Sequence, residues 1–103
     1  EQHKAAGCQV LFHDGWYWMF YIGYHNEDYA QVGVARSRDG VTGWERSKLN
    51  PILAPDENAW DGEACYKPFV LNMGDRWMLW YNGRRGHKEQ IGGAVLDASE
   101  LAF

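Results

Sequence analysis

With 103 residues, of which 46% are hydrophobic and 16% aromatic, the chain is long enough for one folded domain. Its formal net charge is −4 and its ten lysines and arginines form no block, which argues against nucleic acid or an anionic membrane as the main partner. No apolar run reaches the roughly 18 residues that a membrane-spanning helix needs, and because no signal-peptide pattern opens the chain, we expect a cytoplasmic location.

The first half of the chain is predicted to form short strands. They cover residues 9–13, 16–22, 31–37 and 44–46. Asp14-Gly15 separates the first two strands and is a strong hairpin signal, because glycine tolerates the positive φ of a tight turn. The sequence Arg38-Asp39-Gly40 predicts a second turn after the third strand.

The second half repeats this order after a connection at residues 50–62 that contains Pro51 and Pro55. Strands are predicted at residues 66–72, 76–82 and 89–96. Residues 101–103 are a candidate for a short fourth strand.

One sequence unit occurs twice in the chain. Identical residues recur at a spacing of 60 and then, after one deletion, 59 positions: Val10 and Val70, Leu11 and Leu71, Tyr21 and Tyr81, Gly23 and Gly83, Gln31 and Gln90, Gly33 and Gly92, Ala35 and Ala94. Most other paired positions exchange one apolar residue for another. A fixed period of this kind indicates a repeat architecture, in which one unit alone cannot bury its faces.

The two aromatic strands, 16–22 and 76–82, are apolar on both faces, which is typical of sheets covered on both sides. We therefore expect an all-β fold of two four-stranded antiparallel β-propeller blades, with blade one at about residues 5–49, a linker at 50–63 and blade two at 64–103. Closed propellers typically have four to eight blades. Self-association, with three chains as the first choice and two as the second, or a longer parent chain would complete the ring.

Several motifs of the chain are familiar. They are WYWMFYIG at 16–23, GVARSRDG at 33–40, WER at 44–46, NPIL at 50–53, WD at 60–61, YKP at 66–68 and WYNGR at 80–84. Together they resemble the blade signature of a glycosidase superfamily of β-propellers with about five blades in one chain. This superfamily includes arabinanases, xylosidases, invertases and mannosyl phosphorylases, and the chain resembles its C-terminal two blades. The resemblance implies a carbohydrate-active protein, although no residue here matches the family's catalytic aspartate, which comes from an early blade.

The linker at 56–64 and the loops at 24–30 and 84–88 would emerge on the same face of a propeller, where function usually lies. Asp61 and Glu63 are the candidate catalytic residues. In an extended segment they project the same way, roughly 6–7 Å apart, and glycoside hydrolysis uses two carboxyl groups about 5–10 Å apart. The alternative is that Asp61 caps a turn and Glu63 is solvated.

Five further residues are candidates for substrate binding. They are Trp60, Tyr66, Lys67, Arg84 and Arg85. Trp60 is the candidate stacking wall for a sugar. Tyr66 and Lys67 begin the innermost strand of the second unit, near the central axis, and Arg84 and Arg85 belong to a polar loop after Gly83. The alternatives are an ion pair between Lys67 and Asp61 or Glu63, and a solvated loop for the two arginines.

No cofactor or metal is expected. Cys8 and Cys65 are too few for a zinc cluster or a disulfide framework and are interpreted as buried free thiols. Two functions remain open. One is a carbohydrate-active or carbohydrate-binding module related to glycosidases, catalytically incomplete or, if active, a glycoside hydrolase that acts on a saccharide. The other is a non-catalytic scaffold that assembles into a homo-oligomeric propeller.

Overall fold

The computed structural model describes residues 4–26, 29–56 and 58–103. The strands are β1 (Lys4–His13), β2 (Trp16–Tyr24), β3 (Ala30–Ser37), β4 (Glu45–Arg46), β5 (Ala64–Asn72), β6 (Trp77–Arg85) and β7 (Lys88–Leu96), followed by the 3₁₀ helix η1 (Ala98–Glu100). The described part of the chain contains no α-helix. The all-β prediction is confirmed, and seven of the expected strands are present, although β1 begins five residues before the expected strand and the ends of others differ by up to three residues.

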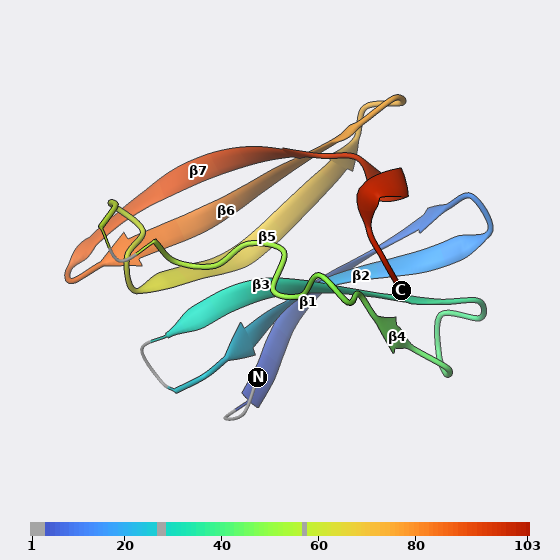
Figure 1. The fold of residues 1–103 in the computed structure, drawn as a ribbon, viewed down its shortest axis with the longest axis horizontal. Helices are drawn as coiled ribbons and strands as arrows, with labels where there is room; N and C mark the ends of the chain where they lie inside the picture. Colours follow the sequence, from blue (N-terminus) through green and yellow to red (C-terminus); the bar gives the residue numbers. More distant parts are fainter. Residues whose placement is uncertain (1–3, 27–28, 57) are drawn as a thin grey trace.

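The seven strands form one open mixed sheet built from two antiparallel meanders. The first meander is β1-β2-β3, with β4 paired to β3, and the second is β5-β6-β7. A single parallel residue pair, Ala30 with Ala64, joins β3 to β5. Because the joint is so short, the two meanders diverge from it and lie one above the other in Figure 1.

The sequence repeat is also a repeat of strand register. Tyr21 pairs with Gly33 across β2 and β3, and Tyr81 pairs with Gly92 across β6 and β7. In both meanders the tyrosine ring fills the space above the glycine: a Cβ on either glycine would lie 2.7 Å from the Cζ atom of its tyrosine. The two meanders are therefore built on the same cross-strand pairs.

The hydrophobic core lies between the two meanders. Its buried members are Trp18, Phe20, Val32 and Val34 from the first meander and Cys65, Val70, Trp77, Leu79 and Tyr81 from the second. Trp77 lies at the centre, with its ring edge-on to Trp18 at 5.3 Å and to Phe20 at 5.8 Å. Strand β5 crosses all three long strands of the first meander, so one face of each meander covers the other.

The remaining face of each meander points outward. Strand β2 is largely buried on both faces, whereas β6 alternates between buried and half-buried residues. Trp77, Leu79 and Tyr81 point into the core, while Met78 and Trp80 lie on the outward face. Coverage of both faces, expected for both aromatic strands, is thus incomplete at β6.

The prediction of a fourth strand in the second unit, at Leu101–Phe103, is wrong. The chain turns at η1, where the Asp97 carboxylate accepts the Ser99 N–H at 3.0 Å, and then crosses to the first meander (Figure 1). The Ala102 carbonyl accepts the Lys48 N–H at 2.7 Å and the Ser47 hydroxyl at 2.8 Å. The second meander therefore has three strands, because its last segment binds beside β4 instead of extending its own edge.

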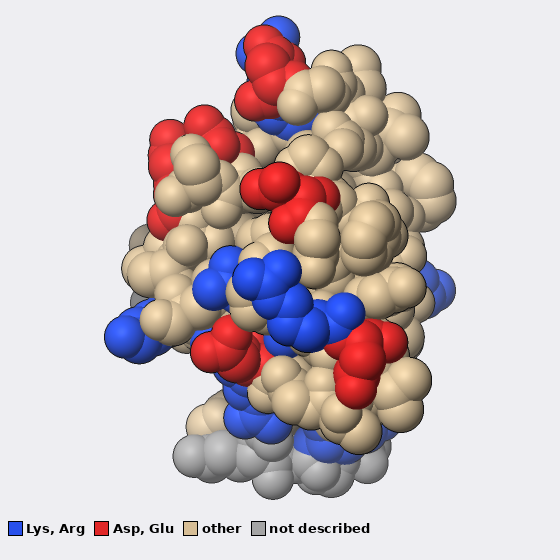
Figure 2. All heavy atoms as spheres, turned by 90° about the vertical axis from the view of Figure 1, so that its right-hand side faces the viewer, with Lys and Arg blue, Asp and Glu red and all other residues tan. Residues whose placement is uncertain are grey.

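The β1–β2 and β3–β4 turns lie at one end of the molecule. Asp14 (φ 52°) and Gly15 (φ 78°) form the expected hairpin turn. In the second turn the Asp39 carboxylate accepts the N–H groups of Val41 at 2.8 Å and Thr42 at 2.7 Å. Hydrogen bonds from the Thr42 hydroxyl and from these N–H groups hold the pKa of Asp39 well below its usual range. Figure 2 shows that acidic and basic side chains interleave on this end.

Candidate functional site

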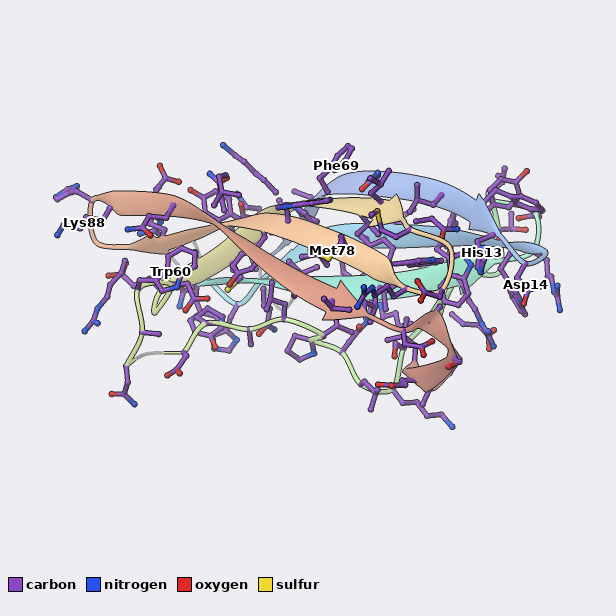
Figure 3. All side chains as sticks on the ribbon, turned by 90° about the horizontal axis from the view of Figure 1, so that it is seen from above. His13, Asp14, Trp60, Phe69, Met78 and Lys88 are labelled. Atoms are coloured by element: carbon purple, nitrogen blue, oxygen red, sulfur yellow. The ribbon has the colours of Figure 1, made fainter. Side chains whose placement is uncertain are left out.

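The linker, the β2–β3 loop and the β6–β7 turn gather at the other end of the molecule, as the sequence predicted. Trp60 and Lys88 lie at this end in Figure 3, and His13 and Asp14 lie at the opposite end. Within the linker, the Asp56 carboxylate accepts the backbone N–H of Asn58 at 3.1 Å. Part of the β2–β3 loop, residues 27–28, is outside the described residues.

Asp61 lies in the interior, with only 7% of its surface exposed. Its Oδ2 atom accepts the Tyr81 hydroxyl at 3.0 Å and faces the Cys65 thiol at 3.5 Å. Burial, and then the negative charge of Asp61, raise the pKa of the Cys65 thiol to about 12. Burial and the hydrogen bond to Asp61 also raise the pKa of Tyr81. Asp61 is thus held as an acceptor between two protonated donors.

Glu63 has a separate set of partners. Its carboxylate forms an ion pair with Arg84 Nη1 at 2.9 Å and accepts the Gly86 N–H at 2.9 Å. Its own N–H donates to the Arg84 carbonyl at 3.0 Å. Glu63 therefore ties the linker to the β6–β7 turn.

The expectation that Asp61 and Glu63 project the same way from an extended segment is wrong. Residues 60 and 61 form a turn and residues 62 and 63 form bends. The bent backbone sends Asp61 inward to Tyr81, while Glu63 reaches Arg84 along the rim. In this arrangement both carboxylates hold the fold together.

Trp60 packs on the interior with one part of its ring and exposes the rest, 39% of the residue. It stacks on Tyr81 with a centroid distance of 6.0 Å and an interplanar angle of 20°. The ring also lies over Gly83, where a Cβ would come within 2.7 Å of Trp60 Cη2. Glycine at this position leaves the space that the indole occupies.

The other candidate binding residues do not converge on one point. Tyr66 packs against a small apolar cluster at the β3–β5 joint, and its hydroxyl donates to Glu89. Lys67 is exposed at a β5 bulge, at φ 53°, and the ion pair of Glu63 is with Arg84, not with this lysine. Arg85 donates to the Ala59 carbonyl at 3.3 Å and so holds the linker.

An open groove of about 760 Å³ runs between the linker and the β2–β3 loop. Its lining is Asn26, Tyr29, Pro55, Asp56, Asn58, Gly62 and Glu63. Glu63 alone belongs to the predicted site residues. The sequence placed these two segments on one face, but the individual residues Tyr29 and Asn58 carried no local signal, because a loop residue joins a groove only through the fold.

Comparison with known proteins finds neither a protein-family model nor a curated protein that matches the chain. Among the residues that the structure describes, no group of three or more histidine, cysteine, aspartate or glutamate side chains is placed to hold a metal ion. No helix in this described part is long and apolar enough to cross a membrane.

Proposed function

We propose that the chain is a β-propeller-type module that binds a saccharide in the groove between the linker and the β2–β3 loop. The observation that carries this proposal is the composition of the groove, in which carboxylate, amide and phenol groups line one open surface. Sugar hydroxyls are recognised by a few placed hydrogen-bonding groups beside an aromatic wall. Tyr29 is the aromatic residue of the groove, and Asp56, Asn58 and Glu63 are its polar partners.

Two further observations support the blade interpretation and the saccharide. The meanders share one register and pack face to face, which is how propeller blades are arranged. The motifs at 16–23, 33–40 and 80–84 resemble blades of carbohydrate-active propellers.

Binding without hydrolysis is the form of this proposal that the geometry favours. Asp61 is buried against Tyr81 and Cys65, and Glu63 is paired with Arg84. A general acid and a nucleophile must both face the same glycosidic bond. With their carboxylates directed to different partners, Asp61 and Glu63 do not form such a pair.

The test uses neutral arabino-, xylo- and fructo-oligosaccharides with saturation-transfer NMR and calorimetry. We expect weak binding that Tyr29→Ala and Asn58→Ala each reduce by tenfold or more. Gln90→Ala, an exposed substitution on β7 at a residue that does not line the groove, is the matched control and should bind as the wild type does. Aryl glycosides of the same sugars should show no turnover. Absence of binding across the panel would contradict the proposal.

A second candidate is a non-catalytic scaffold, and one observation favours it. The outward faces expose large apolar side chains, including Phe12 at 63% and Ile91 at 68%. Surfaces of this kind mark interaction sites. Failure of all saccharide binding together with stable self-association would favour this function.

A further inference from the structure

We propose that the second meander of one chain packs on the first meander of another copy, and that this contact repeats the interface already present inside the chain. The proposal does not depend on saccharide binding. It rests on the sequence repeat, which pairs each residue of the buried inner faces with a residue of the outward faces. The outward residues are exposed or half-buried, except for Tyr21, which is buried.

The inner interface defines two kinds of face. The first meander contributes Trp18, Phe20, Val32 and Val34, and the second contributes Val70, Trp77, Leu79 and Tyr81. Each set has counterparts in the other meander at the repeat spacing. The counterparts of the first set are Met78, Trp80, Ile91 and Gly93, and those of the second set are Val10, Tyr17, Met19 and Tyr21.

These counterparts are the residues of the two outward faces. In β6, Met78 and Trp80 alternate with the buried Trp77, Leu79 and Tyr81. Phe69 and Leu71 lie beside them on β5, exposed at 56% and 47%. Figure 3 shows Phe69 and Met78 midway between the two ends of the molecule. The chain thus presents a copy of each half of its own core interface, on opposite sides.

A groove on the first meander fits this arrangement. It has a volume of about 440 Å³ and its lining includes Ala5, Met19, Tyr21 and Ala35. The counterparts of its first three residues, Cys65, Leu79 and Tyr81, are in the core cluster that buries Phe20 completely. Trp80 is the counterpart of Phe20. We therefore place Trp80 of the second copy in this groove.

A contact between unlike faces is heterologous and repeats from copy to copy until the ring closes. Since each chain contributes two meanders and propellers typically have four to eight blades, closure takes about two to four chains. Three chains are our first choice. A contact between the same face of two copies, by contrast, would give a dimer and no larger assembly.

The experiment is light scattering on the full chain at micromolar concentration. We expect the wild type at an integer multiple of the monomer mass, and Trp80→Glu and Met19→Glu each as monomers. Val41→Glu is the matched control, because Val41 is 77% exposed in the β3–β4 turn and lies on neither face; it should assemble as the wild type does.

The decisive experiment mixes the two monomeric variants. Trp80→Glu keeps the first outward face intact and Met19→Glu keeps the second, so the mixture should form a one-to-one dimer that neither variant forms alone. Formation of this dimer also shows that both variants are folded. A monomeric wild type, or variants that remain separate when mixed, would overturn the proposal.

Discussion

The side-chain amide of Asn50 binds both backbone groups of Val34: it accepts the Val34 N–H at 3.0 Å and donates to the Val34 carbonyl at 2.9 Å. The side-chain amide of Gln9 forms the same pair of hydrogen bonds with Val70: it accepts the Val70 N–H and donates to the Val70 carbonyl at 2.9 Å. Both valines are completely buried. Each amide supplies the hydrogen bonds that a neighbouring strand would otherwise make.

Removing either amide should destabilise the protein. Asn50→Ala leaves the buried Val34 N–H without its acceptor, at a cost of about 1–3 kcal/mol, whereas the Val34 carbonyl keeps the Ser47 N–H at 3.0 Å. Gln9→Ala should have a similar effect at Val70. The free energy of unfolding in urea is the measurement, and the exposed Gln90→Ala should stay within about 0.5 kcal/mol of the wild type. Equal stability of Asn50→Ala and Gln90→Ala would contradict this assignment.

The hairpins were predictable from the sequence because their signals are local. Asp14-Gly15 and the apolar runs beside it report turn and strand within a few residues. The extension of β1 back to Lys4 was missed, since Gly7 (φ 48°) forms a bulge that interrupts the pattern.

Features that depend on tertiary contacts were not predictable. A strand that is apolar on both faces does not encode which face the other meander covers, so nothing in the sequence separates the core residue Trp77 from the outward Trp80. The amide contacts of Asn50 and Gln9 span 16 and 61 residues and have no local pattern. The direction of Asp61 depends on the turn at residues 60–61, which places its carboxylate under Tyr81.

Asp61 and Tyr81 should be strongly coupled in stability. Asp61→Ala leaves the buried Tyr81 hydroxyl without its acceptor, which costs about 1–3 kcal/mol. Tyr81→Phe removes that hydroxyl, so the double variant should be less destabilised than the sum of the single variants, by about 1 kcal/mol or more. A parallel double-mutant cycle on Glu63 and Arg84 should give a coupling energy of less than about 1 kcal/mol, because the Glu63 side chain is 44% exposed. Additive effects at Asp61 and Tyr81 would argue against the buried hydrogen bond.

The free energy of unfolding should fall at alkaline pH because of Cys65 and Tyr81, which lie beside Asp61. The pKa of Cys65 rises in the fold from 9.0 to about 12, and the pKa of Tyr81 also rises above its ordinary value of 10.0. The folded state therefore holds these protons more tightly than the unfolded state. Their contribution is complete below about pH 9 and is lost as the pH rises towards 12.

Urea unfolding at pH 8, 10 and 11 measures this loss. The double variant Cys65→Ala, Tyr81→Phe removes both protons and should show a shallower decline with pH than the wild type. If the wild type and this variant declined in parallel, other groups would be responsible for the alkaline loss.

The neighbouring glycines of β7 should respond oppositely to alanine. A Cβ on Gly92 would lie 2.7 Å from Tyr81 Cζ and 2.8 Å from its hydroxyl, closer than real contacts allow. The Tyr81 ring has little room to move, because Trp60 stacks on it and Asp61 holds its hydroxyl. Gly92→Ala should therefore destabilise the protein by about 1–3 kcal/mol through overpacking.

Gly93 is the matched control one residue away. Its Cβ would meet nothing closer than 3.9 Å, so Gly93→Ala should be neutral or should stabilise by about 0.5–1 kcal/mol, since glycine in a strand has more conformational entropy to lose. The measurement compares the midpoints of thermal and urea unfolding of Gly92→Ala and Gly93→Ala. Combining Gly92→Ala with Tyr81→Leu, which removes the ring, should cost less than the sum of the two changes. Equal effects of alanine at both glycines would show that the Tyr81 ring does not constrain β7.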